Sequence, residues 1–160
     1  MDKLGTSFVN ASGEALGAEC VTGYKLVMVL HSANWWPGCT PFKASLKELY
    51  NEWNKDGAKN LQVVFVSGDK DQGGFDASMK DMPWVGQPMG TDKAAISELV
   101  PCTGYPTPGV INGTTGEVID ADCFGKVDEK NYGEWMAKVW WSMSFHVNQQ
   151  IIYHWYQYLR

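Results

Sequence analysis

The feature that most constrains the fold is a pair of short, mainly apolar runs, residues 25–30 and residues 61–66. Runs of this length suit central strands that are buried on both faces of a sheet. A helical pattern lies between them, beginning near Pro41 and ending near Asp56. Its apolar residues are Phe42, Leu46, Leu49, Tyr50 and Trp53. Strand, helix and strand in this order predict two parallel strands joined by a crossover helix.

The second half of the chain adds shorter elements. Residues 76–81 and 92–100 are predicted as short helices, the second capped by Thr91 or Asp92. Residues 107–111 and 117–119 flank a turn-rich segment and predict an antiparallel hairpin. A last helix is expected to begin after Asp128 and to continue as far as Tyr158. The pattern predicts one α/β domain with a C-terminal extension.

Composition limits the class of protein. Of 160 residues, 44% are hydrophobic and 19% are charged, as in folded globular proteins. The formal net charge of −5 argues against nucleic acid as the main partner. No run is long and apolar enough to span a bilayer, and the first residues do not resemble a secretory signal. We therefore expect an intracellular protein, with cytosolic, ciliary and mitochondrial settings all open.

The four cysteines are Cys20, Cys39, Cys102 and Cys123. They form no C-x-x-C pair and show no zinc-ribbon spacing, so free thiols in a reducing compartment are the simplest interpretation. No metal site or cofactor is expected. His31 is interpreted as a hydrogen-bonded residue at a strand end, and Asp69 and Asp71 as solvated residues of a polar loop.

Several motifs in the same order resemble the thioredoxin-like superfamily, in particular the tryparedoxin and nucleoredoxin type. Residues 30–42 resemble the active-site segment of that family, in which Ser-Ala-x-Trp-Cys-x-x-Cys precedes a helix that opens with Pro-Phe. The tripeptide Met82-Pro83-Trp84 and the segment Tyr105-Pro106-Thr107 also resemble family motifs, and the family's proline in the latter is cis. The resemblance covers roughly residues 6–127.

The resemblance implies a thioredoxin fold: a central mixed β-sheet flanked by helices, here with an extra aromatic-rich C-terminal helix. Residues 1–132 form the thioredoxin-like domain in this interpretation. Residues 133–160 begin as the last helix of the fold and continue as a docking extension.

The resemblance also identifies a missing catalytic group. The first cysteine of the family motif, at a helix N-terminus, is the thiolate that attacks a disulfide, and the second cysteine resolves the mixed disulfide. Here Trp36 stands at the first position and Cys39 at the second. An indole cannot attack sulfur, and a resolving cysteine is expected to be buried. The degenerate active-site loop comprises Trp35, Trp36, Pro37, Gly38 and Cys39, with Tyr105 and Pro106 facing it.

Two points at this loop stay open in the sequence. Cys102 is a weak candidate partner for Cys39, although packing as a small buried side chain is the preferred interpretation. Trp35 and Trp36 either anchor a protein partner, or Trp36 folds onto its own surface without a role.

The C-terminal helix has more aromatic residues than one packing face needs. A second stripe continues beyond the expected end of the fold, and we expect it to dock on another protein, with packing on its own domain and attachment to a membrane surface as alternatives. The candidate docking residues are Trp141, Phe145, Ile152, Trp155 and Tyr156.

The sequence therefore favours a pseudo-enzyme, without catalytic activity, that acts as a structural or binding subunit of a larger protein assembly. The alternative is a divergent thiol-disulfide oxidoreductase or redox sensor that uses Cys39. A third, weaker possibility is a binder of small thiols in the groove beside Pro106.

Overall fold

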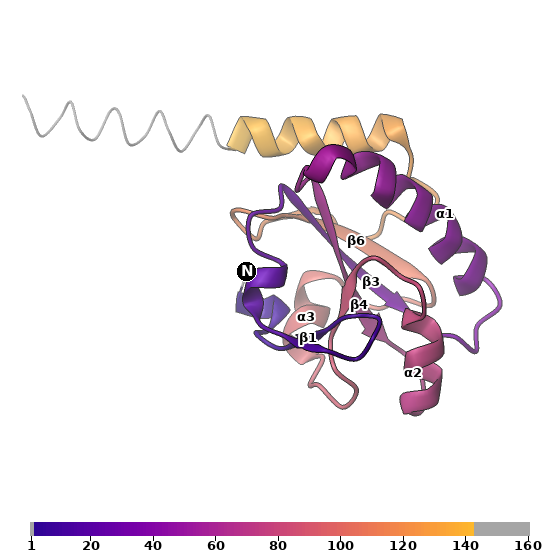
Figure 1. Cartoon of the computed structure of the whole chain (residues 1–160). Coiled ribbons are helices and arrows are strands. Elements are labelled where there is room, and N and C mark those ends of the chain that lie inside the picture. The colour runs from indigo at the N-terminus through magenta and orange to yellow at the C-terminus, as the bar shows by residue number, and fades with distance from the viewer. Residues whose placement is uncertain (1, 143–160) are drawn as a thin grey trace, which may run out of the picture.

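The structure is a computed structural model that describes residues 2–142. A central seven-stranded sheet has the order β2-β1-β5-β4-β3-β6-β7 (Figure 1). Its strands are β1 (Phe8–Val9), β2 (Ala15–Leu16), β3 (Leu26–Ser32), β4 (Leu61–Ser67), β5 (Val85–Gly86), β6 (Thr107–Asn112) and β7 (Val118–Asp120). Strands β3, β4 and β5 are parallel, whereas β1, β2, β6 and β7 are added by antiparallel pairing. The predicted mixed sheet is confirmed.

Helices cover both faces of this sheet. The α-helices with described ends are α1 (Cys39–Trp53), α2 (Gln72–Met79) and α3 (Ala94–Leu99). Short 3-10 turns are η1 (Asp2–Leu4), η2 (Ala18–Cys20) and η3 (Lys55–Gly57). A further helix begins at residue 129 and runs along α1 to the last described residues (Figure 1).

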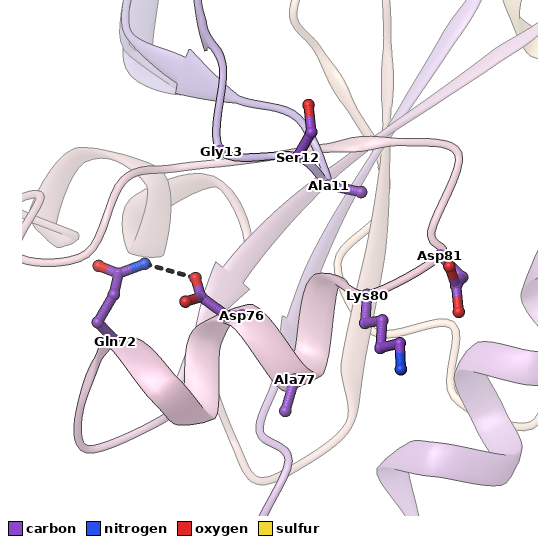
Figure 2. A pocket seen from close by; sticks show the side chains of 8 residues that line it. All are labelled: Ala11, Ser12, Gly13, Gln72, Asp76, Ala77, Lys80 and Asp81. Atoms are coloured by element: carbon purple, nitrogen blue, oxygen red, sulfur yellow. Dashed lines mark hydrogen bonds between the residues drawn. The ribbon is translucent and has the colours of Figure 1, made fainter.

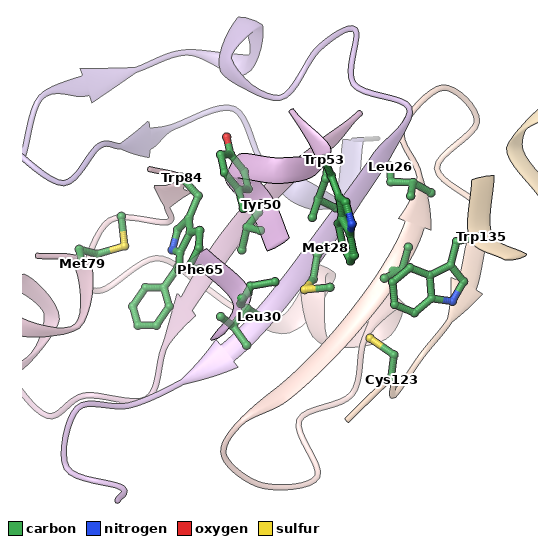
Figure 3. Close-up of a cluster of buried hydrophobic side chains, with 14 of the residues drawn as sticks. Leu26, Met28, Leu30, Tyr50, Trp53, Phe65, Met79, Trp84, Cys123 and Trp135 are labelled. Atoms are coloured by element: carbon green, nitrogen blue, oxygen red, sulfur yellow. The ribbon is translucent and has the colours of Figure 1, made fainter. Parts of the chain in front are cut away.

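The core has two halves, one on each face of the sheet. The larger half joins β3 and β4 to α1, α2 and the helix that begins at residue 129, and it contains Trp53, Trp84 and Trp135 (Figure 3). The smaller half lies under α3 and contains Val29, Ile96 and other aliphatic residues. Strands β3 and β4 are buried along their whole length, as the two apolar runs predict.

Three predicted helix boundaries were wrong. Helix α1 begins at Cys39 rather than Pro41, because a proline in the first turn lacks only an N–H group that has no helical partner there. Helix α2 begins at Gln72 rather than Asp76, because Asp71 caps it by accepting a hydrogen bond from the Gly74 N–H at 2.9 Å.

Helix α3 begins at Ala94, with Lys93 rather than Thr91 or Asp92 at the cap position. The Asp92 carboxylate still accepts a hydrogen bond from the Ala94 N–H at 3.0 Å. The antiparallel hairpin of β6 and β7 is confirmed.

Candidate functional site

The degenerate loop lies where β3 ends and α1 begins. Its turn is closed by backbone hydrogen bonds from the Trp36 N–H to the Ala33 carbonyl and from the Cys39 N–H to the Trp36 carbonyl. Strand β6 lies next to β3 and pairs with it. A cis peptide bond between Tyr105 and Pro106 immediately precedes β6. The fold therefore brings residues 35–39 and 105–106 to one edge of the sheet, as the resemblance implies.

The only cysteine of the loop, Cys39, is inaccessible. Its exposed fraction is 0%, whereas Trp36 is 47% exposed. The Trp36 indole lies over Gly38, because a Cβ atom added there would be 3.4 Å from the indole Nε1. The N-terminus of α1 therefore presents an aromatic ring to solvent, while the thiol of the loop is buried.

Trp35 is held in place by its own hydrogen bond. Its indole Nε1 donates to the Gly68 carbonyl at 2.9 Å, although 51% of the residue is exposed. The ring meets Trp36 edge to face at a centroid distance of 6.1 Å, and Tyr105 at 5.7 Å. The three rings form one connected surface on this face of the protein.

Tyr105 occupies space that a side chain at position 68 would need. A Cβ atom added to Gly68 would be 2.2 Å from the Tyr105 ring. Burial, and secondarily its contact with the Cys102 thiol, raises the pKa of the Tyr105 hydroxyl, which is therefore neutral at physiological pH. Tyr105 thus presents a neutral ring and hydroxyl beside Trp35.

The preferred interpretation of Cys102 as a packed side chain was wrong. Cys102 is exposed, and its thiol lies 3.5 Å from the Gly104 carbonyl oxygen. Its segment leaves α3 after Val100 and follows the surface toward Pro106, so the side chain has no core to enter. All four cysteines are free. Burial raises the pKa of the Cys123 thiol to about 12, so this thiol is not reactive at neutral pH.

A buried polar cluster lies beneath the loop, and it corrects the prediction for Asp69. Asp69 is only 9% exposed, and its carboxylate accepts hydrogen bonds from the Asn34 N–H at 2.6 Å and from the hydroxyls of Ser67 and Ser78 at 2.8 Å. Because these donors satisfy the carboxylate, it can remain buried at the end of β4. Asp71 is exposed at the start of α2, as predicted.

Lys43 is a second member of this cluster and was missed in the sequence. Its buried ammonium donates to the Ser78 carbonyl at 2.8 Å, near the C-terminal end of α2, where a positive charge is favourable. Burial lowers the pKa of Lys43, and the nearby Asp69 carboxylate opposes that shift. The sequence contains one indication of this burial. Lys43 precedes Leu46 and Tyr50 at helical spacing, so it lies on the same buried face of α1.

His31 is confirmed as a hydrogen-bonded strand residue. It is buried on β3, and its Nε2 lies 2.8 Å from the Val100 carbonyl, to which it donates. Burial lowers the pKa of His31, which keeps the ring neutral at pH 7. This contact fastens the end of α3 to the sheet.

The start of the C-terminal helix has one buried and one exposed face. Trp135 and Val139 pack in the core, whereas Trp141 is 76% exposed. The ring of Trp140 lies 5.5 Å from the Lys25 ammonium. The other predicted docking residues, Phe145, Ile152, Trp155 and Tyr156, lie outside the described residues.

Two surface pockets are alternative candidate sites. The first, of about 810 Å³, lies between the turn at Ser12 and helix α2, where the Gln72 amide bonds to Asp76 at 2.7 Å (Figure 2). None of its lining residues belongs to the degenerate loop. The second, of about 500 Å³, begins at Gly38 and is lined by apolar residues such as Phe42 and Phe124. It therefore extends the aromatic surface along α1.

Within residues 2–142, no group of three or more His, Cys, Asp or Glu side chains is arranged to hold a metal ion. The same residues contain no helix of the length and apolar character that crossing a membrane requires.

Comparison with known proteins agrees with this architecture. A family model described as thioredoxin-like matches residues 23–118. Tryparedoxin of Trypanosoma brucei brucei is 34% identical over 128 residues, which cover 78% of this chain and 85% of that protein. Probable nucleoredoxin 1 of Arabidopsis thaliana is 31% identical over 96 residues, 59% of this chain, and the match spans only 16% of the plant protein.

A solved structure extends the agreement to three dimensions. Native tryparedoxin I from Crithidia fasciculata superposes with a TM-score of 0.67 at 26% identity, covering 81% of this chain and 88% of that one. Sequence, fold and structural likeness agree, and the chain belongs to the thioredoxin-like family.

Proposed function

We propose that this protein is a catalytically degenerate member of the thioredoxin-like family that acts as a binding or structural subunit of a larger protein assembly. One observation carries the proposal. The exposed position at the N-terminus of α1 holds the indole of Trp36, and the remaining thiol of the loop, Cys39, is fully buried.

The chemistry of disulfide exchange explains why this observation matters. A thiolate must reach a substrate sulfur, form a mixed disulfide and then be released by a second thiol. Trp36 has no sulfur for the first step. Cys39 has no surface at which a substrate disulfide could approach it. The loop therefore lacks an attacking group, although the supporting strand, helix and cis-proline are present.

The binding role rests on the exposed aromatic residues. Trp35, Trp36 and Trp141 are 51%, 47% and 76% exposed, and tryptophan is strongly enriched among residues that anchor protein interfaces. The proposed assembly contacts are the loop at Trp36 and the distal part of the C-terminal extension. Its predicted docking residues are Trp141, Phe145, Ile152, Trp155 and Tyr156.

A specific observation supports the alternative, a divergent oxidoreductase or redox sensor. The exposed Cys102 thiol lies beside Tyr105, and after burial both Cys102 and, more weakly, Cys39 contribute to raising the pKa of the Tyr105 hydroxyl. In this alternative, Cys39 is the redox-active thiol and Cys102 its partner.

An insulin-reduction assay with dithiothreitol separates the two proposals. The wild-type protein and Cys39→Ser should both give only the uncatalysed rate. Trp36→Cys recreates Cys-Pro-Gly-Cys at the start of α1 and should gain activity, and adding Cys39→Ser to it should remove that gain. Wild-type activity that disappears in Cys39→Ser would sink the degenerate-enzyme proposal.

The assembly role needs its own test. Native complexes should be isolated from the source organism with the full chain and with a chain that lacks residues 146–160. Loss of co-purifying protein on truncation, with an unchanged urea midpoint of unfolding, is the expected result. Identical complexes for both chains would remove the C-terminal segment from the proposal.

A further inference from the structure

Three aromatic side chains form a corner at the degenerate loop. We use the term aromatic corner for Trp35, Trp36 and Tyr105. The Trp35 ring is nearly perpendicular to both neighbours, with interplanar angles of 81° to Trp36 and 85° to Tyr105. Perpendicular rings leave ring faces available beside one another, which is the arrangement that binds cations in proteins.

The aromatic corner is fixed before any partner binds. The Trp35 indole is hydrogen-bonded to the Gly68 carbonyl, and the Tyr105 ring fills the space above Gly68. Trp36 rests on Gly38. Because these contacts set the rings in place, little side-chain freedom remains to be lost on binding.

A cation already lies at the aromatic corner. The Lys70 ammonium is 5.9 Å from the centroid of the Trp35 ring, within the range of a cation–π interaction. Lys70 is exposed and belongs to the chain's own polar loop, so a stronger cation can replace it. The position of Lys70 therefore shows which ligand chemistry the Trp35 face accepts.

We propose that the aromatic corner binds an arginine side chain on the partner protein. The proposal rests on the binding role proposed above and names the chemistry of its partner. A guanidinium is planar and weakly hydrated, so it stacks on indole rings better than the compact ammonium of Lys70. The formal net charge of −5 also favours approach of a basic partner surface.

The experiment uses the full chain labelled with ¹⁵N and a small probe, N-acetyl-arginine amide. Binding is followed by the NMR signals of the indole N–H groups of Trp35 and Trp36, with Trp141 as the internal reference. N-acetyl-citrulline amide has almost the same shape and no charge, and it is the matched control. Saturable shifts at Trp35 and Trp36 with arginine alone are expected. Equal shifts with citrulline or with N-acetyl-lysine amide, or equal shifts at Trp141, would overturn the proposal.

A pair of variants tests the role of Lys70. Lys70→Gln frees the Trp35 face and should tighten arginine binding about two- to five-fold. Lys80→Gln makes the same change in net charge on another surface and should leave the affinity unchanged. If both variants tighten binding equally, only overall charge is at work and the proposal fails. These readouts are independent of insulin reduction, so their failure leaves the missing catalytic thiol untouched.

Discussion

At its C-terminal end, helix α1 places Trp53 face to face with Tyr132, with ring centroids 4.2 Å apart and planes 9° apart. The Trp53 indole Nε1 donates to the Glu129 carboxylate at 2.7 Å, and the Trp53 carbonyl accepts from the Asn60 amide. The indole N–H and the backbone carbonyl of Trp53 therefore both have partners within the same chain.

At its N-terminal end, the same helix begins at Cys39 with Gly38 at the N-cap position, without a side-chain cap, and the exposed rings of Trp35 and Trp36 precede it. The difference teaches that aromatic content alone does not identify a binding surface. At the C-terminal end of α1, Trp53 is buried in the core. At the N-terminal end, Trp35 and Trp36 of the preceding loop are exposed to solvent.

The largest expected effect tests the closed end. Trp53→Ala removes a buried ring from the larger core half and should lower the free energy of unfolding by about 3–5 kcal/mol in urea denaturation. Trp53→Phe keeps a ring against Tyr132 and should cost less. A loss below about 1 kcal/mol for Trp53→Ala would break the comparison, because the closed end would then contribute no more than the exposed one.

A smaller effect is expected from His31, which lies on β3, the strand that leads into the exposed loop. Burial lowers the pKa of His31 in the folded state, so between that value and 6.5 the unfolded chain binds more protons. Stability should therefore decrease as the pH falls below about 6.5, by at most about 1.4 kcal/mol per pH unit for one proton.

Urea denaturation at several pH values, with His31→Gln alongside, isolates this contribution. The variant keeps a donor for the Val100 carbonyl but cannot titrate, so its profile should be flatter. Parallel profiles would show that other groups cause the acid sensitivity.

The smallest effect is expected at the exposed end. Trp36→Ser should change the free energy of unfolding by no more than about 0.5 kcal/mol, because the ring lies outside the core. Circular dichroism in urea measures this, since the substitution alters tryptophan fluorescence directly. If Trp36→Ser lowered the free energy of unfolding as much as Trp53→Ala, Trp36 would have a packing role. The argument that its exposed ring serves as a binding surface would then fail.

The order of the elements could be predicted because local patterns encode it. The two apolar runs became β3 and β4, and the hairpin became β6 and β7. The very short β2 and β5 could not be predicted, because two-residue strands have no periodicity and exist only through pairing with neighbours.

The site was predicted in part, and the errors share one cause. Burial of Cys39 followed from its place inside the motif, and it is confirmed. Asp69 and Cys102 were assigned the wrong exposure, because exposure depends on how each segment lies against the rest of the fold, which no local pattern encodes. Asp69 meets Ser78 on α2, and nothing local in the loop indicates that contact.

The tight approach of Tyr105 to Gly68 has a consequence for the evolutionary record of this site. Any Cβ atom at position 68 collides with the ring at position 105. A larger side chain at one of these positions therefore requires a smaller one at the other. In an alignment of homologues, a bulky residue at 68 should accompany a small one at 105, and glycine at 68 should accompany an aromatic residue. Co-variation of this pair would show that the close contact between positions 68 and 105 constrains both residues in the homologues.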